Sequence, residues 1–377
     1  MKLRAAASAV VLFAASVMPL AAQTSVFGVH GIGFPGKPYG VRSRGMGGGG
    51  AIFDARSALN PATVVGMPRL VVTASFGTTM SGYTAQDSVV NGLTETRFPF
   101  AMLGGRIRRT PLAFALSYAT YADRTYDRAM LDSVTIRGET VEVNDRIASD
   151  GSVADIRGAL AMRVLRWLNV GAAVHVVSGS ARLTQHRTFS DSVYRTLYES
   201  NRVGLQGMGL SAGATAALLP GLSVAVAYRT DTRLEATLDS TPAGGVELPR
   251  SVTAGLAVAP YGAVTLSTTV SWHSWSDAAG DLEAVGGANA FDTWEVGTGI
   301  EIGGGAARSP LRFGVRYAEL PFSPHEQARE IALAAGTALR FAGDRATIDC
   351  SIERVSRKGA GAEERAWYLA FALTIMP

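Results

Sequence analysis

The feature that most constrains this chain is an alternation of apolar with small or polar side chains, which recurs from about residue 69 to residue 377. Residues 311–317 show it clearly, because Leu, Phe, Val and Tyr occupy one parity and Arg or Gly the other. Successive side chains of a strand point to opposite faces, so such a segment has one apolar and one polar face. Residues 112–119, 222–229 and 294–302 repeat the pattern. The chain is therefore predicted to be all-β.

Two classes of all-β protein alternate in this way, the soluble sandwich and the transmembrane β-barrel. Lys is nearly absent from the alternating segments, and their less apolar parity consists mainly of Ala, Gly, Ser and Thr with occasional Arg or Glu, which suits a crowded lumen. Aromatic side chains lie near segment ends, where the interfacial girdles of membrane barrels lie: Trp167, Tyr228, Trp272, Trp275, Trp294 and Trp367. We therefore predict an antiparallel transmembrane barrel.

About fourteen strands are expected, each long enough for the roughly 9–11 residues that a tilted strand needs to cross a bilayer. They are 69–80, 95–107, 111–123, 153–165, 168–183, 202–218, 221–234, 248–259, 262–275, 292–303, 310–319, 328–341, 345–356 and 364–376. Short connections alternate with long ones, which are 81–94, 124–152, 184–201, 235–247, 276–291, 320–327 and 357–363. Outer-membrane barrels have short periplasmic turns and long extracellular loops, so both termini are predicted to be periplasmic.

The region before the barrel divides into two parts. Residues 1–22 have a basic start, an apolar stretch and small residues at its end, which predicts a signal peptide cleaved near Ala22 to Thr24. Residues 23–68 do not alternate and are rich in Gly, which predicts a segment that plugs the lumen of the barrel formed by 69–377. No later stretch approaches 18 uninterrupted apolar residues, so no transmembrane helix is expected.

Two short motifs of this segment carry a resemblance. Residues 43–48 (SRGMGG) and 54–62 (DARSALNPA) resemble the N-terminal signature of the outer-membrane long-chain fatty acid transporter family and its relatives. The resemblance implies a hatch inside a fourteen-stranded barrel of the cell outer membrane, with these plug-motif residues: Gly45, Met46, Gly47, Asn60 and Pro61. It also implies passive uptake of a hydrophobic or amphipathic small molecule, fatty-acid-like or an aromatic hydrocarbon, by a protein in contact with outer-membrane lipid.

Two sets of side chains are candidates for the lumen. Apolar ligand contacts are expected from Phe27 and Phe34 in the plug and from Phe98 and Phe100 on a strand. Ten charged residues have the inward parity: Arg157, Arg163, Arg229, Glu295, Glu301, Arg312, Arg316, Arg340, Asp349 and Glu353. A salt-bridge network that anchors the plug is favoured for them, because charges in a low-dielectric cavity need partners. An Arg-lined site for the carboxylate of an amphipathic ligand stays open as the alternative.

Other functions have weaker support. The glycine patterns at 31–36 and 204–209 lack the strand and helix of a dinucleotide site, and the five His residues lack metal-ligand spacing. No metal, cofactor or catalytic residue is predicted, although His273 beside Ser274 leaves a barrel-embedded hydrolase as the least favoured option. Basic residues are dispersed, so the net charge of +4 does not indicate nucleic acid. The second hypothesis from the resemblance is a scaffold or shuttle barrel with a secretion-machinery protein as partner.

Overall fold

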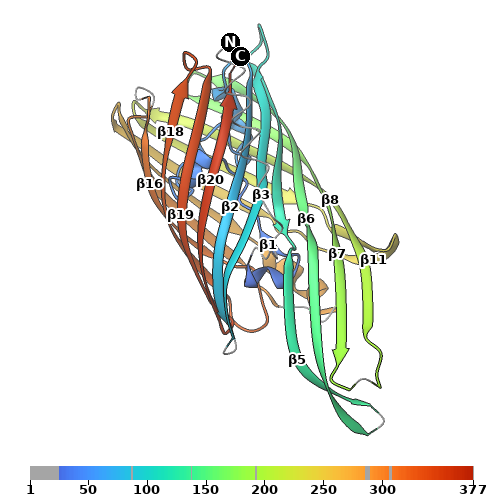
Figure 1. Cartoon of the computed structure of the whole chain (residues 1–377). Coiled ribbons are helices and arrows are strands. Elements are labelled where there is room, and N and C mark those ends of the chain that lie inside the picture. The colour runs from blue at the N-terminus through green and yellow to red at the C-terminus, as the bar shows by residue number, and fades with distance from the viewer. Residues whose placement is uncertain are drawn as a thin grey trace, which may run out of the picture.

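The computed structural model describes residues 25–376 except 86–87, 137, 192, 285–288 and 305–307; the predicted signal peptide and its cleavage site lie outside the described residues. Fourteen antiparallel strands close into a barrel, because the last strand pairs with the first (Figure 1). They are β2 (Val71–Ala85), β3 (Ser88–Arg106), β4 (Leu112–Asp123), β6 (Glu139–Leu165), β7 (Leu168–Phe189), β8 (Leu197–Leu219), β9 (Leu222–Asp231), β12 (Ser251–Tyr261), β13 (Val264–His273), β15 (Thr293–Ile302), β16 (Leu311–Glu319), β18 (Arg329–Phe341), β19 (Ala346–Gly359) and β20 (Ala362–Ile375).

All fourteen predicted strands fall on barrel strands, so the predicted fold is confirmed. The predicted long connections 81–94 and 124–152 are wrong in extent. In the first, β2 and β3 continue to Ala85 and Ser88, and in the second, β5 (Tyr126–Ile136) pairs with the first part of β6. Continued pairing satisfies the backbone N–H and C=O groups of these hairpins. As Figure 1 shows, β5, β6, β7 and β8 project beyond the other strands at the long-loop end, opposite the short-turn end where β20 stops.

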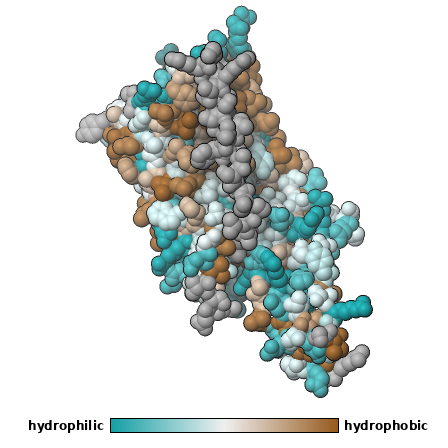
Figure 2. All heavy atoms as spheres, in the orientation of Figure 1, coloured by the Kyte–Doolittle hydropathy of each residue, from teal (hydrophilic) through white to brown (hydrophobic). Residues whose placement is uncertain are grey.

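The barrel is apolar outside and charged inside. On β16, Leu311, Phe313 and Val315 are exposed, whereas Arg312 and Arg316 are buried in the lumen. A soluble sandwich has its apolar side chains inside and its charged side chains outside. The distribution here is the reverse and fits a barrel whose outer solvent is lipid. Figure 2 shows the outer surface of the barrel in the orientation of Figure 1. Apolar side chains gather on its part nearer the short-turn end, and hydrophilic side chains are more frequent toward the projecting strands. Among the described residues, no helix is long and apolar enough to span a membrane.

Short elements lie at the long-loop end. β10 (Leu234–Leu238) pairs with β8, and β11 (Thr241–Val246) pairs with β10, so these two strands extend the wall beyond β9. The elements that cover the lumen are η3 (Trp275–Ala278), α3 (Ala279–Ala284), β14 (Asn289–Ala290) and β17 (Phe322–Ser323). Trp275 is buried there, with its ring centroid 5.0 Å from that of Phe322. The prediction that Trp275 belongs to the interfacial girdle is therefore wrong, because η3 turns it over the lumen; Trp167, Trp294 and Trp367 are exposed on the outer surface.

The N-terminal segment packs inside the barrel, as predicted for a hatch. Its elements are η1 (Val26–Val29), β1 (Phe34–Pro35), α2 (Val41–Arg44) and η2 (Pro61–Gly66). It begins at the long-loop end, where the Ser25 hydroxyl donates to Glu364 Oε2 at 2.7 Å. It leaves at the short-turn end, where the backbone N–H of Arg106 donates to the carbonyl oxygen of Pro68 at 3.2 Å. The plug thus runs the length of the lumen before β2 starts.

Candidate functional site

Backbone of the plug lies directly on backbone of the wall. A Cβ atom built on Gly314 of β16 would lie 2.1 Å from the carbonyl carbon of Met46, and one on Gly297 of β15 would lie 2.4 Å from the carbonyl oxygen of Gly47. Gly47 itself has φ +60, a conformation that favours glycine. The Thr269 hydroxyl adds a bond to the carbonyl oxygen of Gly49 at 2.8 Å. Glycines on both surfaces therefore allow the contact between plug and wall.

Asn60 joins the second half of the plug to the opposite wall. Its Oδ1 accepts from the backbone N–H of Ala62 at 3.0 Å and so caps η2, whose first residue is Pro61. Its Nδ2 donates to the carbonyl oxygen of Ala214 on β8 at 3.2 Å. Pro61 packs against Gly171 of β7, where a Cβ would lie 2.6 Å from the Pro61 carbonyl carbon. The carboxamide is needed at this buried position because one group must both accept and donate.

Every Lys and Arg side chain of the plug forms an ion pair with a carboxylate of the wall. Arg42 Nη2 lies 2.7 Å from Glu301 Oε1, and Arg56 Nη1 lies 3.0 Å from Asp349 Oδ2. The other two pairs are Lys37 with Glu295, and Arg44 with Glu353 at 3.5 Å. Because these carboxylates belong to β15 and β19, the ion pairs attach the plug to that side of the barrel.

Wall arginines link the same carboxylates to one another. Arg312 lies 2.6 Å from Glu301 and 2.7 Å from Asp349, and Arg316 Nη2 lies 3.0 Å from Glu353. The inward parity of the strands predicts these groups in the lumen, but three further members of the network were not predicted: Glu330, Arg357 and Glu364. Inward parity could have identified Glu330, whereas Arg357 was assigned to a connection that the structure shows as strand.

One plug carboxyl is surrounded by cations. The buried Asp54 accepts from the Ser43 hydroxyl at 3.1 Å and from the backbone N–H of Arg56 at 3.0 Å. Burial alone would raise the pKa of Asp54, but the guanidinium groups of Arg56 and Arg42 outweigh it and hold that pKa below its usual value. The plug therefore carries its own carboxylate, the ionised Asp54, next to the network of the wall.

The remaining predicted charges lie apart from this network. Arg340 donates to the carbonyl oxygen of Gly304 at 2.6 Å, and the exposed Arg163 donates to Asn169 at 3.4 Å. Arg229 bonds to Asp231 and Asp155 on the other side of the lumen. Arg157 is buried, and none of its guanidinium nitrogens has a hydrogen-bond partner within the described part of the chain.

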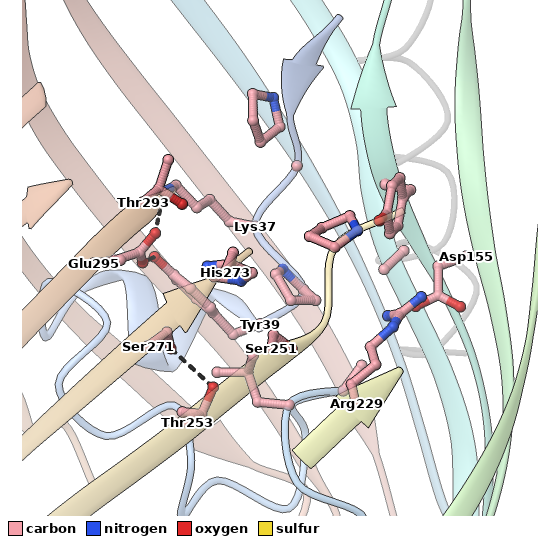
Figure 3. A pocket seen from close by; sticks show the side chains of 18 of the residues that line it. Lys37, Tyr39, Asp155, Arg229, Ser251, Thr253, Ser271, His273, Thr293 and Glu295 are labelled. Atoms are coloured by element: carbon pink, nitrogen blue, oxygen red, sulfur yellow. Dashed lines mark hydrogen bonds and ion pairs between the residues drawn. The ribbon is translucent and has the colours of Figure 1, made fainter. Parts of the chain in front are cut away.

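A cavity of about 130 Å³ lies inside the barrel between plug residues 34–39 and the wall, on the lumen side of the elements at the long-loop end (Figure 3). Its apolar lining includes Phe34, Tyr121, Trp275 and Leu320. As Figure 3 shows, two polar groups face each other across it: Lys37 with Glu295 on one side, and Asp155 with Arg229 on the other.

Of the four predicted ligand-contacting phenylalanines, only Phe34 lines this cavity, and Phe27 packs in the same apolar cluster as Phe34. Phe98 is exposed on the outside of β3, whereas Phe100 is buried nearer the short-turn end with Val64. These two residues share a sequence parity but not a face, because a β-bulge shifts the register of β3 between them. The structure therefore does not bring the four together.

The histidine singled out from the sequence also lines the cavity. His273 lies at the end of β13, but the hydroxyl of Ser274 donates to Asp277 Oδ2 at 2.8 Å instead of to His273. Within the described residues, no group of three His, Cys, Asp or Glu side chains could hold a metal ion. A different Ser and His line the same cavity and bond to each other, Ser211 and His175, and neither was predicted as a site residue.

Comparison with solved structures finds the same fold, a closed fourteen-stranded barrel with an internal hatch, in outer-membrane channels. The fold is similar to the CymD monoaromatic hydrocarbon channel (TM-score 0.59, 19% identity, 92% of this chain and 99% of that one). It is also similar to the Ralstonia pickettii toluene transporter TbuX (TM-score 0.60, 17% identity, 93% of this chain and 100% of that one). A third similar structure is a Pseudomonas aeruginosa FadL homologue (TM-score 0.60, 14% identity, 90% of this chain and 98% of that one).

No protein-family model matches the sequence, and no curated protein matches it. The structural likeness nevertheless spans about nine-tenths of the chain and includes the hatch. The resemblance to hydrophobic-compound channels that the two N-terminal motifs predicted is thus confirmed at the level of the fold.

Proposed function

We propose that this protein is a channel of the cell outer membrane for passive uptake of small apolar molecules, with single-ring aromatic compounds as the substrate class. The observation that carries the proposal is the size of the cavity, about 130 Å³. An engineered apolar cavity of about 150 Å³ in another protein takes up benzene. One aromatic ring fits such a space.

The lining of the cavity supports capture without an energy source. An apolar solute gains roughly 25 cal/mol for each Å² of surface that leaves water. Phe34 and Tyr121 line the cavity with aromatic surface for such a solute, and Trp275 closes the long-loop side. The structural neighbours described as a toluene transporter and a monoaromatic hydrocarbon channel have the same architecture, which favours the same substrate class here.

Passage through the lumen requires the plug to move. Plug residues 34–39 and 48–59 border the cavity, and the ion pairs and glycine contacts of residues 42–56 hold the plug against the wall between the cavity and the short-turn end. Ligand captured at the long-loop end therefore reaches the periplasm only when these contacts rearrange. The signal peptide predicted at residues 1–22 would direct the chain to the outer membrane.

Two substitutions at neighbouring positions of β9 test the proposal. Ala227 is buried and lines the cavity, whereas Val226 is exposed on the outer surface. Ala227→Phe fills the cavity and is expected to lower the initial rate of toluene uptake by about tenfold, the equivalent of roughly 1.4 kcal/mol. Val226→Phe adds the same ring outside and leaves uptake unchanged. The assay uses labelled toluene and labelled oleate with cells whose outer membrane carries lipopolysaccharide.

Three outcomes would count against this function. Cells with the wild-type protein could take up toluene no faster than cells with an empty vector. Ala227→Phe and Val226→Phe could behave alike. Oleate could enter faster than toluene, which would reassign the substrate to fatty acids. In the first case, the scaffold hypothesis would predict an envelope or secreted protein that copurifies with the barrel.

A further inference from the structure

Three polar side chains from adjacent strands form a bonded row on the wall of the cavity. Asp155 of β6 lies with its Oδ1 and Oδ2 2.9 and 3.0 Å from His175 Nδ1. His175 of β7 lies with its Nε2 2.8 Å from Ser211 Oγ on β8. All three side chains are buried and all three line the cavity.

The sheet fixes this arrangement. Asp155 is opposite Val177 and Ser211 is opposite Ala173, so His175 lies on the diagonal between them, two residues along the strand from each partner position. Diagonal neighbours on one face of an antiparallel pair are close enough for side chains to meet. Because the strands belong to a closed barrel, the row is held without any loop.

The order of the three groups is that of a nucleophile, its base and the residue that orients the base. A carboxylate on Nδ1 holds the imidazole in the tautomer whose Nε2 can accept a proton. Nε2 then faces the Ser211 hydroxyl at hydrogen-bond distance, which is the geometry that activates a serine. His175 therefore has the partners that His273 lacks.

A cationic donor is next to the row. Arg229 of β9 is directly opposite Ser211 in the strand register. Its Nη1 bonds to Asp155 and its Nε bonds to Asp231, whereas its Nη2 is buried and has no hydrogen-bond partner among the described residues. A free N–H donor beside a serine nucleophile is what an oxyanion that develops at an attacked carbonyl requires.

We propose that Ser211, His175 and Asp155 are a catalytic triad that hydrolyses carboxylic esters of single-ring aromatic compounds within the barrel. Ser211 Oγ attacks the ester carbonyl carbon, and the hydroxyl proton passes to His175 Nε2. The tetrahedral intermediate, with its oxyanion facing Arg229, expels the alcohol, which takes that proton as the C–O bond breaks. Water then attacks the acyl-Ser211 carbonyl and gives a proton to His175. The Oγ–C bond breaks, Ser211 recovers the proton, and the carboxylic acid leaves.

Covalent capture of the serine is the decisive measurement. A structural network would satisfy the same hydrogen bonds, but it would not make Ser211 reactive. Purified full-length protein in detergent is treated with phenylmethylsulfonyl fluoride, whose single ring matches the cavity. We expect one adduct, formed as the Oγ–S bond replaces the S–F bond, and peptide mapping is expected to locate it on Ser211. An unmodified Ser211, or equal labelling of many serines, would overturn the proposal.

Hydrolysis of phenyl acetate, followed by phenol release, gives the second readout. Ser211→Ala is expected to lower the rate on the order of a thousandfold or more. The matched control is Ser351→Ala, which removes a hydroxyl from another buried lumenal serine, on β19 and away from the cavity, and should keep the wild-type rate. Equal rates for wild type and Ser211→Ala would refute the triad. If Ser211→Ala does not fold, the mapping on wild-type protein still decides.

This activity would share the cavity of the proposed channel, but the two proposals can fail separately. Toluene carries no ester, so its uptake by cells tests transport alone. Toluene uptake without labelling of Ser211 would remove the hydrolase and keep the channel. Labelling and phenol release without toluene uptake would do the reverse.

Discussion

At the scale of a single residue, the wall glycines should decide whether the plug can dock. Gly314→Ala places a methyl group 2.1 Å from the Met46 carbonyl carbon, a contact with backbone that cannot rotate away. We expect this substitution to destabilise the folded barrel by about 1–3 kcal/mol, the usual cost of overpacking. The midpoint of urea unfolding in detergent, with its slope, measures the change.

The control for Gly314→Ala is Gly262→Ala, at a short turn where an added Cβ has no atom within 4 Å. Alanine there only restricts the unfolded chain, so it should be neutral or stabilise the barrel by up to about 1 kcal/mol. Effects of the same sign at both positions would mean that the plug does not rest on the wall at Met46.

At the scale of the element, ion pairs between wall and plug should contribute more than any surface pair. Glu301 is buried and accepts from Arg42 at 2.7 and 3.0 Å and from Arg312 at 2.6 Å. Glu301→Gln removes the carboxylate that pairs with Arg42 and leaves Arg312 with Asp349 as its remaining ion-pair partner among the described residues, which should destabilise the protein by about 3 kcal/mol. Because α2 carries Arg42, limited proteolysis should also cleave the plug faster in this variant.

Glu363→Gln is the matched control, because it makes the same change in the exposed Arg365–Glu363 pair. Exposed pairs contribute about 0–1 kcal/mol, so urea unfolding should barely change. If Glu363→Gln lowered the free energy of unfolding as much as Glu301→Gln, burial would not be what sets the strength of these ion pairs.

Elements with local signatures could be predicted from sequence, and contacts between distant segments could not. The parity of Arg312 and Arg316 is a local property of their strand, so their inward direction was predictable. The partner of Lys37 is Glu295, 258 residues away, and nothing in the sequence states the path of the plug that brings them together. Phe98 is a different case: a bulge in β3 places Phe98 outside and Phe100 inside, and the sequence gives no sign of that bulge.

The bonded row on the cavity was not accessible to sequence analysis. The short turn at 166–167 makes β6 and β7 neighbours, but a β-bulge between Arg163 and Leu165 shifts their register by one residue, so the turn alone does not place Arg157 opposite His175 or Asp155 beside the imidazole. Ser211 follows the long excursion of β7 and β8 beyond the barrel, and its register depends on the exact length of that excursion. The sequence therefore does not predict a triad whose members lie on both sides of such a long connection.

At the scale of the whole molecule, the position of a residue along the barrel should matter more than its exposure. Phe313 on β16 is 49% exposed and has the apolar residues Ile300 and Ala335 opposite it on the neighbouring strands, whereas Leu131 on the projecting β5 is 88% exposed beyond the other strands. Phe313→Arg puts a charge against lipid and should cost about 2–4 kcal/mol near the bilayer midplane. Leu131→Arg, although it changes the more exposed side chain, should cost nothing measurable because water surrounds β5. Urea titration of both variants in phospholipid vesicles measures the difference. Equal losses of unfolding free energy in the two variants would place the projecting strands in the bilayer. That result would contradict the orientation of the barrel argued from its surface.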